Sequence, residues 1–199
     1  MSAVTVQLAA SREALSRSLP PNAMTEHLLS RRSLLTAVAL GAARPLAAAA
    51  ELEGTQRRPW PAGKPTPTLT LPAWEGPLWR LDDARGDVVL LNFWASWCEP
   101  CRAEMPSLEL LEQRHESQRL KVMAVNFRET DGTIRRYLDS TPVSLTILRD
   151  TDGAAARAWQ VRIFPTTVVI DRQGRALFTV TGEVDWAGPT AREWMLSVL

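Results

Sequence analysis

The chain of 199 residues has little of what marks several common functional classes. Its formal net charge is only +1, so no basic surplus points to a nucleic-acid partner. It contains no glycine-rich phosphate loop and no Ser/His/Asp set, and His115 is the only histidine after residue 50. Two cysteines in total exclude a disulfide scaffold of the small secreted kind. A hydrophobic content of 45% is enough for one sizeable core, which indicates one domain.

A long hydrophobic run is also missing. The apolar segment 34–43 is well short of the roughly 18 residues that a membrane-spanning helix needs. It follows an arginine pair and precedes small residues that end in an Ala-x-Ala-like site near Ala48 and Ala50, the three-part pattern of an export signal. Residues 24–50 are therefore predicted to be a signal peptide. The stretch Ser30–Leu35 resembles the twin-arginine motif, and an ordinary Sec signal is the alternative.

The predicted signal divides the chain. Residues 1–23 add nothing to the signal, so we expect them to be a mis-called extension and Met24 to be the true start. Residues 51–67, rich in proline, glycine and charge, are predicted to be a linker, and 68–199 the folded domain. Export to the periplasm exposes the cysteines to an oxidising compartment. A signal that is not cleaved would tether the domain to the membrane.

Alternating strand and helix patterns predict a mixed sheet. Residues 88–95 are apolar in succession, as in a strand buried on both faces, and 101–118 form an amphipathic helix. We expect further strands over 68–71, 77–81, 120–125, 145–148, 166–170 and 176–180, and further helices over 131–140, 154–159 and 189–199. This order predicts an α/β domain with helices on both faces of a central sheet.

The chemistry of the sequence is concentrated in Cys98 and Cys101, which lie between the buried strand and the first long helix. A structural zinc site needs four ligands, and the chain has no second cysteine pair to supply them. A purely structural disulfide is also disfavoured, because a bridge that spans two residues restrains the unfolded chain little. At a helix N-terminus, free N–H groups and the helix dipole stabilise the Cys98 thiolate, which makes it a nucleophile. Cys101 would then resolve the mixed disulfide, and Pro100 suits the first helical turn.

The segment Asn92–Cys101, NFWASWCEPC, resembles the active-site segment of the thioredoxin superfamily. It is most similar to exported thiol–disulfide oxidoreductases of the TlpA/ResA/CcmG (DsbE) type. Phe164-Pro165 and the turn at 171–174 resemble the cis-proline loop and hairpin of that family, and Gly182 and Val184 occupy the place of its short glycine-containing motif. The resemblance extends from about Thr68 to the C-terminus.

This resemblance implies a thioredoxin fold with an N-terminal β-hairpin extension and a central αβ insert. It also implies a cis bond before Pro165, which would present the backbone of Phe164 to a substrate strand. Trp97, Glu99 and Pro100 complete the expected substrate-binding set. One departure is Ile163, where most members of the family carry glycine.

Glu104 is predicted to move protons. Thioredoxins usually carry a buried aspartate six residues before the first cysteine, and this position is Asn92 here. Glu104 follows Cys101 by three residues on the same helix face and resembles the buried glutamate of ResA-type proteins. A carboxyl group in apolar surroundings has a raised pKa and can exchange protons near neutral pH. The alternative is a surface glutamate in a helix salt bridge.

The resemblance thus implies a protein-disulfide reductase that acts on exported proteins, for example apocytochrome c. Glu99 between the cysteines opposes a thiolate and argues against a strongly oxidising couple. Electrons would come from a membrane thiol transporter of the DsbD/CcdA type. No cofactor is expected beyond the Cys98–Cys101 disulfide, and no metal. Two alternatives stay open: a Cu(I) chaperone that uses both cysteines with Met105, and an oxidase or isomerase of the DsbA type.

Overall fold

The computed structural model describes residues 54–199. The predicted extension 1–23, the predicted signal 24–50 and the start of the predicted linker lie outside the described residues. Within residues 54–199, no helix combines the length and the apolar character that a membrane crossing requires. 

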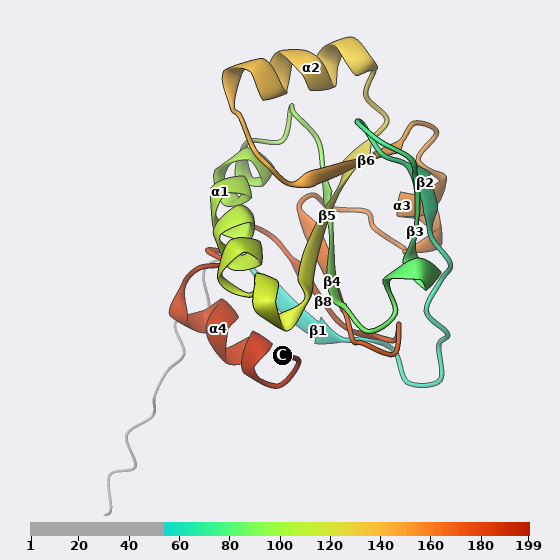
Figure 1. Cartoon of the computed structure of the whole chain (residues 1–199), viewed down its shortest axis with the longest axis vertical. Helices are drawn as coiled ribbons and strands as arrows, with labels where there is room; N and C mark the ends of the chain where they lie inside the picture. The colour runs from blue at the N-terminus through green and yellow to red at the C-terminus, as the bar shows by residue number, and fades with distance from the viewer. Residues whose placement is uncertain (1–53) are drawn as a thin grey trace, which may run out of the picture. The chain divides into compact units, whose positions relative to one another are not determined.

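A six-stranded mixed sheet forms the centre of the domain, as predicted (Figure 1). The three strands β4, β5 and β6 are parallel, and the others are antiparallel to their neighbours. Along the sheet the strands are β1 (Gln56–Pro59), β8 (Ala176–Thr181), β7 (Thr166–Ile170), β4 (Val88–Trp94), β5 (Leu120–Phe127) and β6 (Thr146–Asp150).

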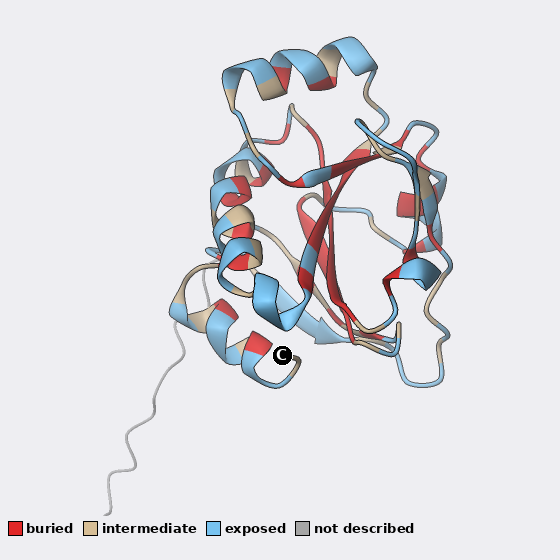
Figure 2. Cartoon of the chain, in the orientation of Figure 1, coloured by how far each residue is buried: buried red, intermediate tan, exposed pale blue. Residues whose placement is uncertain are grey.

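Strand β4 lies at the heart of the sheet, and all seven of its residues are buried (Figure 2). Its alternate side chains enter two different core clusters, with Leu90 and Trp94 in one and Leu91 and Phe93 in the other. The first cluster is covered by the helices α1 (Glu99–Arg114), α2 (Asp131–Ser140) and α4 (Pro189–Leu196). The second is covered by α3 (Ala154–Ala158) and the 3-10 turn η1 (Leu81–Ala84). This double burial explains the unbroken apolar run in the sequence.

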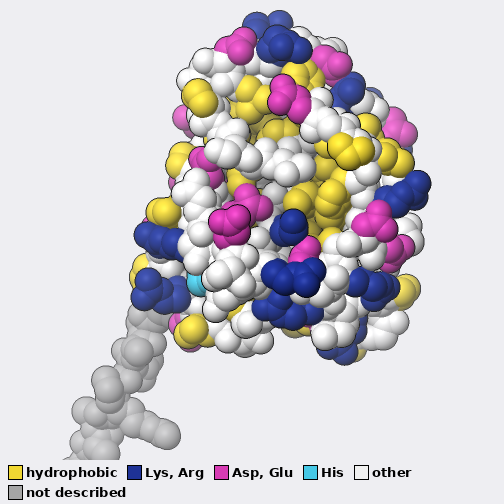
Figure 3. All heavy atoms as spheres, in the orientation of Figure 1, with side chains coloured by type: hydrophobic (Ala, Val, Ile, Leu, Met, Phe, Trp, Pro, Cys, Tyr) yellow, Lys and Arg dark blue, Asp and Glu magenta, His cyan; other side chains and the backbone are white. Residues whose placement is uncertain are grey.

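A two-stranded hairpin and an αβ unit accompany the central sheet. Strands β2 (Thr70–Pro72) and β3 (Leu78–Arg80) pair antiparallel as a separate two-stranded sheet. The unit α2–β6 follows β5 and adds the edge strand β6. On the face seen in Figure 3, charged side chains of both signs are interspersed, and hydrophobic side chains gather below α2. Trp74, Leu138 and Val143 line a pocket there, between α2 and β6.

The linker prediction is wrong for residues 56–59. These residues form β1, which pairs antiparallel with β8 and places Gln56 opposite Thr181. The segment continues into Trp60, whose backbone N–H donates to the carbonyl of Leu177 at 2.8 Å. The Trp60 ring packs against that of Trp159, with 5.9 Å between the ring centroids. All four β1 side chains are exposed, so no hydrophobic alternation marked the strand. Main-chain hydrogen bonds to the open edge of β8 hold it instead.

Helix α1 begins two residues before the predicted start and ends at Arg114. The reason for the early start is local, because the sulfur of Cys98 caps the helix by accepting a hydrogen bond from the N–H of Cys101 at 3.3 Å. A short 3-10 turn, η2 (Glu116–Gln118), follows, and Arg119 in the left-handed conformation ends it. The cysteine pair is thus part of the first turn of α1.

Candidate active site

Cys98 and Cys101 form a disulfide at the start of α1, just after the loop that follows β4. Their Cα atoms are 5.3 Å apart. The N–H of Cys98 donates to the carbonyl of Ala95 at 3.1 Å, a turn that closes the loop between strand and helix. Cys98 retains 6% of its surface exposed, whereas Cys101 is fully buried. Cys98 is therefore the more accessible of the two sulfur-bearing residues.

An aromatic rim stands beside the disulfide. Trp97 is 66% exposed, whereas Trp94 is fully buried in the core. The Trp97 ring packs edge-to-face on Phe164 with 5.9 Å between centroids, and Phe164 in turn lies 4.9 Å from Phe127. Fold topology thus brings Trp97 and Phe164 together from segments far apart in the sequence. Exposed Ile163 extends the apolar surface.

The Phe164–Pro165 peptide bond is cis, as the resemblance implied. The loop is held on both sides, because the Pro165 carbonyl accepts from the N–H of Gly182 at 3.0 Å and the Thr166 hydroxyl donates to the carbonyl of Ile163 at 2.8 Å. Between these anchors, the backbone N–H and C=O of Phe164 make no hydrogen bond to another described residue. They are therefore free to pair with an added strand. Ile163 in place of glycine is accommodated without a positive φ.

Glu99 and Pro100 lie in the first turn of α1, between the two cysteines. The carboxylate of Glu99 is exposed and forms an ion pair with Arg102 at 3.1 Å. This pair is solvated, so it is worth little in stability. It places one negative and one positive charge on the surface next to Cys98.

Glu104 is buried, with 2% of its surface exposed, and does not make the alternative surface salt bridge. One carboxylate oxygen accepts from the side-chain amide of Asn92 at 2.6 Å. The other accepts from the N–H of Val184 at 3.2 Å and from the indole N–H of Trp186 at 3.4 Å. Strand β4, helix α1 and the segment after β8 therefore meet at this carboxyl group.

Burial raises the pKa of Glu104 from 4.5 to about 8, and the nearby charge of Glu183 acts in the same direction. The hydrogen bonds from Asn92, Val184 and Trp186 stabilise the charged form and offset part of the rise in pKa. All three donors are neutral, and no lysine or arginine among residues 54–199 forms an ion pair with Glu104. The group can therefore take up or release a proton near neutral pH, one helical turn beyond Cys101.

Several residues of this environment were not identified from the sequence. No sequence pattern marks Trp186, and Val184 is marked only as part of the family motif, yet both donate to Glu104. Thr167 accepts a second hydrogen bond from the Asn92 amide at 3.0 Å, which orients that amide. Separations of roughly 75 to 82 positions carry no local signal for such contacts.

Glu129 was also missed. It follows β5, and its carboxylate accepts from both the N–H of Ser96 at 2.7 Å and the Ser96 hydroxyl at 2.6 Å. It accepts in addition from the Asn126 amide at 2.7 Å. These bonds hold the loop that precedes Cys98 against the end of β5.

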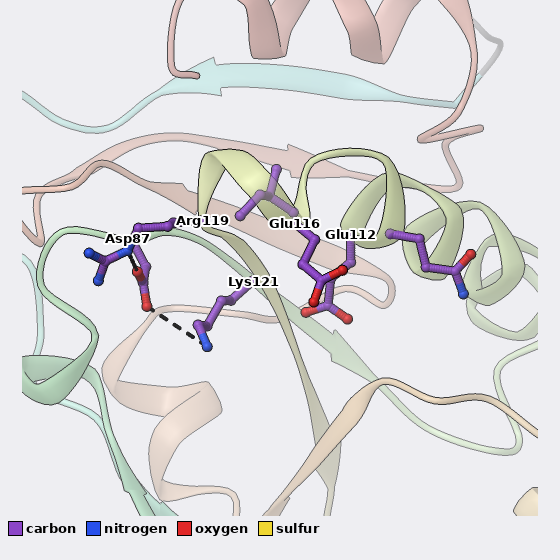
Figure 4. A pocket seen from close by; sticks show the side chains of 7 residues that line it. Asp87, Glu112, Glu116, Arg119 and Lys121 are labelled. Carbon is purple, nitrogen blue, oxygen red and sulfur yellow. Dashed lines mark hydrogen bonds and ion pairs between the residues drawn. The ribbon is translucent and has the colours of Figure 1, made fainter.

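A second polar hollow lies at the opposite end of β4 and α1 (Figure 4). Asp87 precedes β4, and Arg119 and Lys121 approach its two oxygens at 2.6 and 4.0 Å. Glu112 near the end of α1 accepts from the N–H of Val122 at 2.7 Å, and burial raises its pKa. Three carboxyl groups and two cations line this hollow, and none of its lining residues contains sulfur. The disulfide end is therefore the candidate active site.

Comparison with known proteins agrees with this geometry. The AhpC/TSA family profile matches residues 62–176. The chain is 38% identical over 115 residues to the thioredoxin-like protein YneN of Bacillus subtilis, covering 56% of this chain and 66% of YneN. It is 33% identical over 120 residues to the thiol-disulfide oxidoreductase ResA of the same organism, covering 60% of this chain and 67% of ResA.

A similar fold is found in the crystal structure of a putative thiol:disulfide interchange protein DsbE from Chlorobium tepidum. The TM-score is 0.64 at 30% identity, and the match covers 68% of this chain and 96% of that one.

Proposed function

This chain belongs to the AhpC/TSA family of thioredoxin-like proteins, with the ResA- and CcmG-like thiol–disulfide oxidoreductases, and from that premise we propose that it reduces disulfides of exported proteins. The observation that carries the proposal is a disulfide that caps α1, with a buried carboxyl group one turn further along the helix.

The proposed reaction begins with the reduced protein. The Cys98 thiolate attacks one sulfur of the client disulfide, forms a mixed disulfide and releases the other client sulfur as a thiolate, which takes up a proton. Cys101 then loses its proton and attacks the Cys98 sulfur. The Cys98–Cys101 disulfide forms, and the second client thiol leaves. Two electrons pass from the dithiol to the client.

Glu104 supports the second step. Cys101 is fully buried, so its proton has no direct route to bulk water. A carboxylate whose pKa is about 8 is basic enough to accept that proton and can return it in the next cycle. Asn92 cannot exchange a proton itself, but its amide donates to Glu104 and holds the carboxyl group in place.

The rim supports client binding. An extended client segment would pair with the free N–H and C=O of Phe164, while Trp97 and Phe164 cover the reacting sulfurs. Glu99 and Pro100 would contact the client from the helix side. Backbone pairing recognises no particular sequence, which suits a protein that acts on several clients.

The proposed setting is the periplasm, which the protein would reach by its predicted signal at 24–50. An oxidising compartment returns the cysteines to the disulfide, so a reductant is needed for each cycle. We propose a membrane thiol transporter of the DsbD/CcdA type as the donor and apocytochrome c as one client. Both assignments rest on the resemblance of the segment Asn92–Cys101 to exported oxidoreductases of the TlpA/ResA/CcmG type.

Trapping in the exporting cell tests this function. In a Cys101→Ser variant the second step is blocked, so Cys98 should accumulate mixed disulfides with clients and with the donor. The matched control carries Cys98→Ser as well and should capture nothing. If the single variant captures no more protein than the double variant, the proposed function is wrong.

Two further measurements distinguish the proposed reductase from the oxidase and from the Cu(I) chaperone. A reductant should equilibrate with glutathione nearer to the potential of thioredoxin, about −270 mV, than to that of DsbA, about −120 mV. An equilibrium near the DsbA value would establish the oxidase. A tight one-to-one Cu(I) complex of the reduced protein would establish the chaperone, although Met105 is fully buried in the core.

A further inference from the structure

A recess separate from the hollows described above adjoins the cis-proline loop. It has a volume of about 290 Å³ and lies where β1 and the residues after it approach the end of α3. Ile163 and Thr166, which flank the Phe164–Pro165 bond, form part of its wall. A client strand paired with Phe164 would therefore continue directly over this recess.

The charged side chains around the recess are all basic. Arg58, Lys64 and Arg162 line it, and no aspartate or glutamate does. None of the three forms an ion pair with a carboxylate in residues 54–199. The ammonium group of Lys64 instead lies 4.8 Å from the centroid of the Trp60 ring, which fixes its position at the edge. Arg58 donates a hydrogen bond to the neutral side chain of Gln56 at 2.6 Å, so its charge is not neutralised. Three cations that line one recess without an ion-pair partner favour an anionic occupant.

Threonine residues line the recess beside the cations. Thr179 and Thr181 come from β8. A threonine hydroxyl can donate a hydrogen bond and a carboxylate accepts hydrogen bonds only, so these residues suit an anionic occupant.

We propose that this recess receives an acidic side chain of the client polypeptide, so that disulfides flanked by aspartate or glutamate are reduced fastest. The inference rests on the proposed function and adds a sequence preference that backbone pairing at Phe164 alone would not supply. Recruitment of strand β1 to the sheet creates the preference, because Arg58 comes from β1 and Lys64 from the loop after it.

Matched peptides test the preference. Each pair has one internal disulfide and differs only in Glu or Gln at a single flanking position, and the positions on both sides are scanned. With the reduced protein at low ionic strength, we expect kcat/KM for the Glu peptide to exceed that for the Gln peptide by about threefold to fivefold at one position. Added salt should reduce the ratio toward one.

Two charge-reversal variants give the decisive control. Arg162→Glu should abolish or invert the Glu/Gln ratio, and Lys64→Glu should do the same without altering the cis-proline loop. Arg192→Glu makes the same change in net charge on an exposed residue of α4, outside the recess, and should keep the wild-type ratio. Equal rates at every position, or a ratio that Arg162→Glu leaves unchanged, would overturn this inference alone. Failure to reduce either peptide would overturn the proposed function with it.

Discussion

The domain buries one carboxyl group beside the disulfide and another at the opposite end of β4, and the two groups have different hydrogen-bond and ion-pair partners. Asp87, before the start of β4, is 6% exposed and faces the cations of Arg119 and Lys121. Glu104, one turn after the disulfide, is 2% exposed and faces only the neutral donors of Asn92, Val184 and Trp186.

Burial alone therefore does not mark a functional carboxyl group. A buried carboxylate with cationic partners forms ion pairs that contribute to structure, whereas one with only neutral donors is free to exchange a proton once burial has raised its pKa. Glu104, with a pKa of about 8, is of the second kind. This difference distinguishes Glu104 at the disulfide end from Asp87 at the opposite end.

The largest expected effect lies at the sulfur end. Cys98→Ser should lower the rate of disulfide reduction by at least about a thousandfold, because the remaining thiol, Cys101, is fully buried and out of reach of a client disulfide. Asp87→Asn, at the opposite end, should change that rate by less than about twofold. The measurement is reduction of a disulfide peptide by each reduced protein. A large kinetic loss in the Asp87 variant would contradict the division of the domain into two ends.

Glu104→Gln should slow the same reaction by about a hundredfold at pH 7, the usual size of a general-base contribution. The amide keeps the shape of the side chain but cannot take up the Cys101 proton. The rise in wild-type rate with pH around 8 should be missing from the variant. Glu112→Gln, the same change on the same helix at the far end, is the control and should retain both rate and pH profile. Identical profiles for Glu104→Gln and wild type would remove Glu104 from the mechanism.

The stability of the oxidised protein should also depend on pH through Glu104. The folded-state pKa is raised, so the protonated carboxyl favours folding fully below about pH 4.5, and this contribution is lost as pH rises through about 8. We expect the wild type to lose on the order of 3 kcal/mol between pH 5 and pH 9 relative to Glu104→Gln. Urea unfolding at the two pH values measures it. A constant difference between the two proteins would show that Glu104 does not titrate in this range.

The smallest expected effect concerns Asp87. Asp87→Asn should lower the free energy of unfolding by about 1 kcal/mol at pH 7, because it removes the partner of Arg119 and Lys121 while the partners themselves stay solvated. Asp82→Asn is the control, since its ion pair with Arg85 is exposed on both sides and should contribute nothing measurable. Thermal or urea unfolding measures the stability of both variants against the wild type. An Asp87→Asn variant as stable as the wild type would contradict a structural role for Asp87.

Much of the fold could be predicted because its signals are local. Residues 166–170 and 131–140 were assigned to strand and helix with the bounds that the structure has. The buried strand β4 was recognised from its unbroken apolar run. Strand β1 could not be found in this way, because its exposed Gln-Arg-Arg-Pro side chains carry no periodic pattern and its pairing depends on the distant β8.

The candidate site likewise combines features that local sequence predicts with features that depend on long-range contacts. Residue spacing alone predicts that Cys98 and Cys101 lie at a strand-to-helix junction with Glu104 one turn further along, because positions within one helix need no tertiary contact. Three features depend on long-range packing: Glu104 is buried among neutral donors, Phe164 contacts Trp97, and basic residues of β1 and of the loop after it line the recess beside the cis-proline loop. These features join segments far apart in the chain, and the electrostatic environment of a group is set by what folding packs around it.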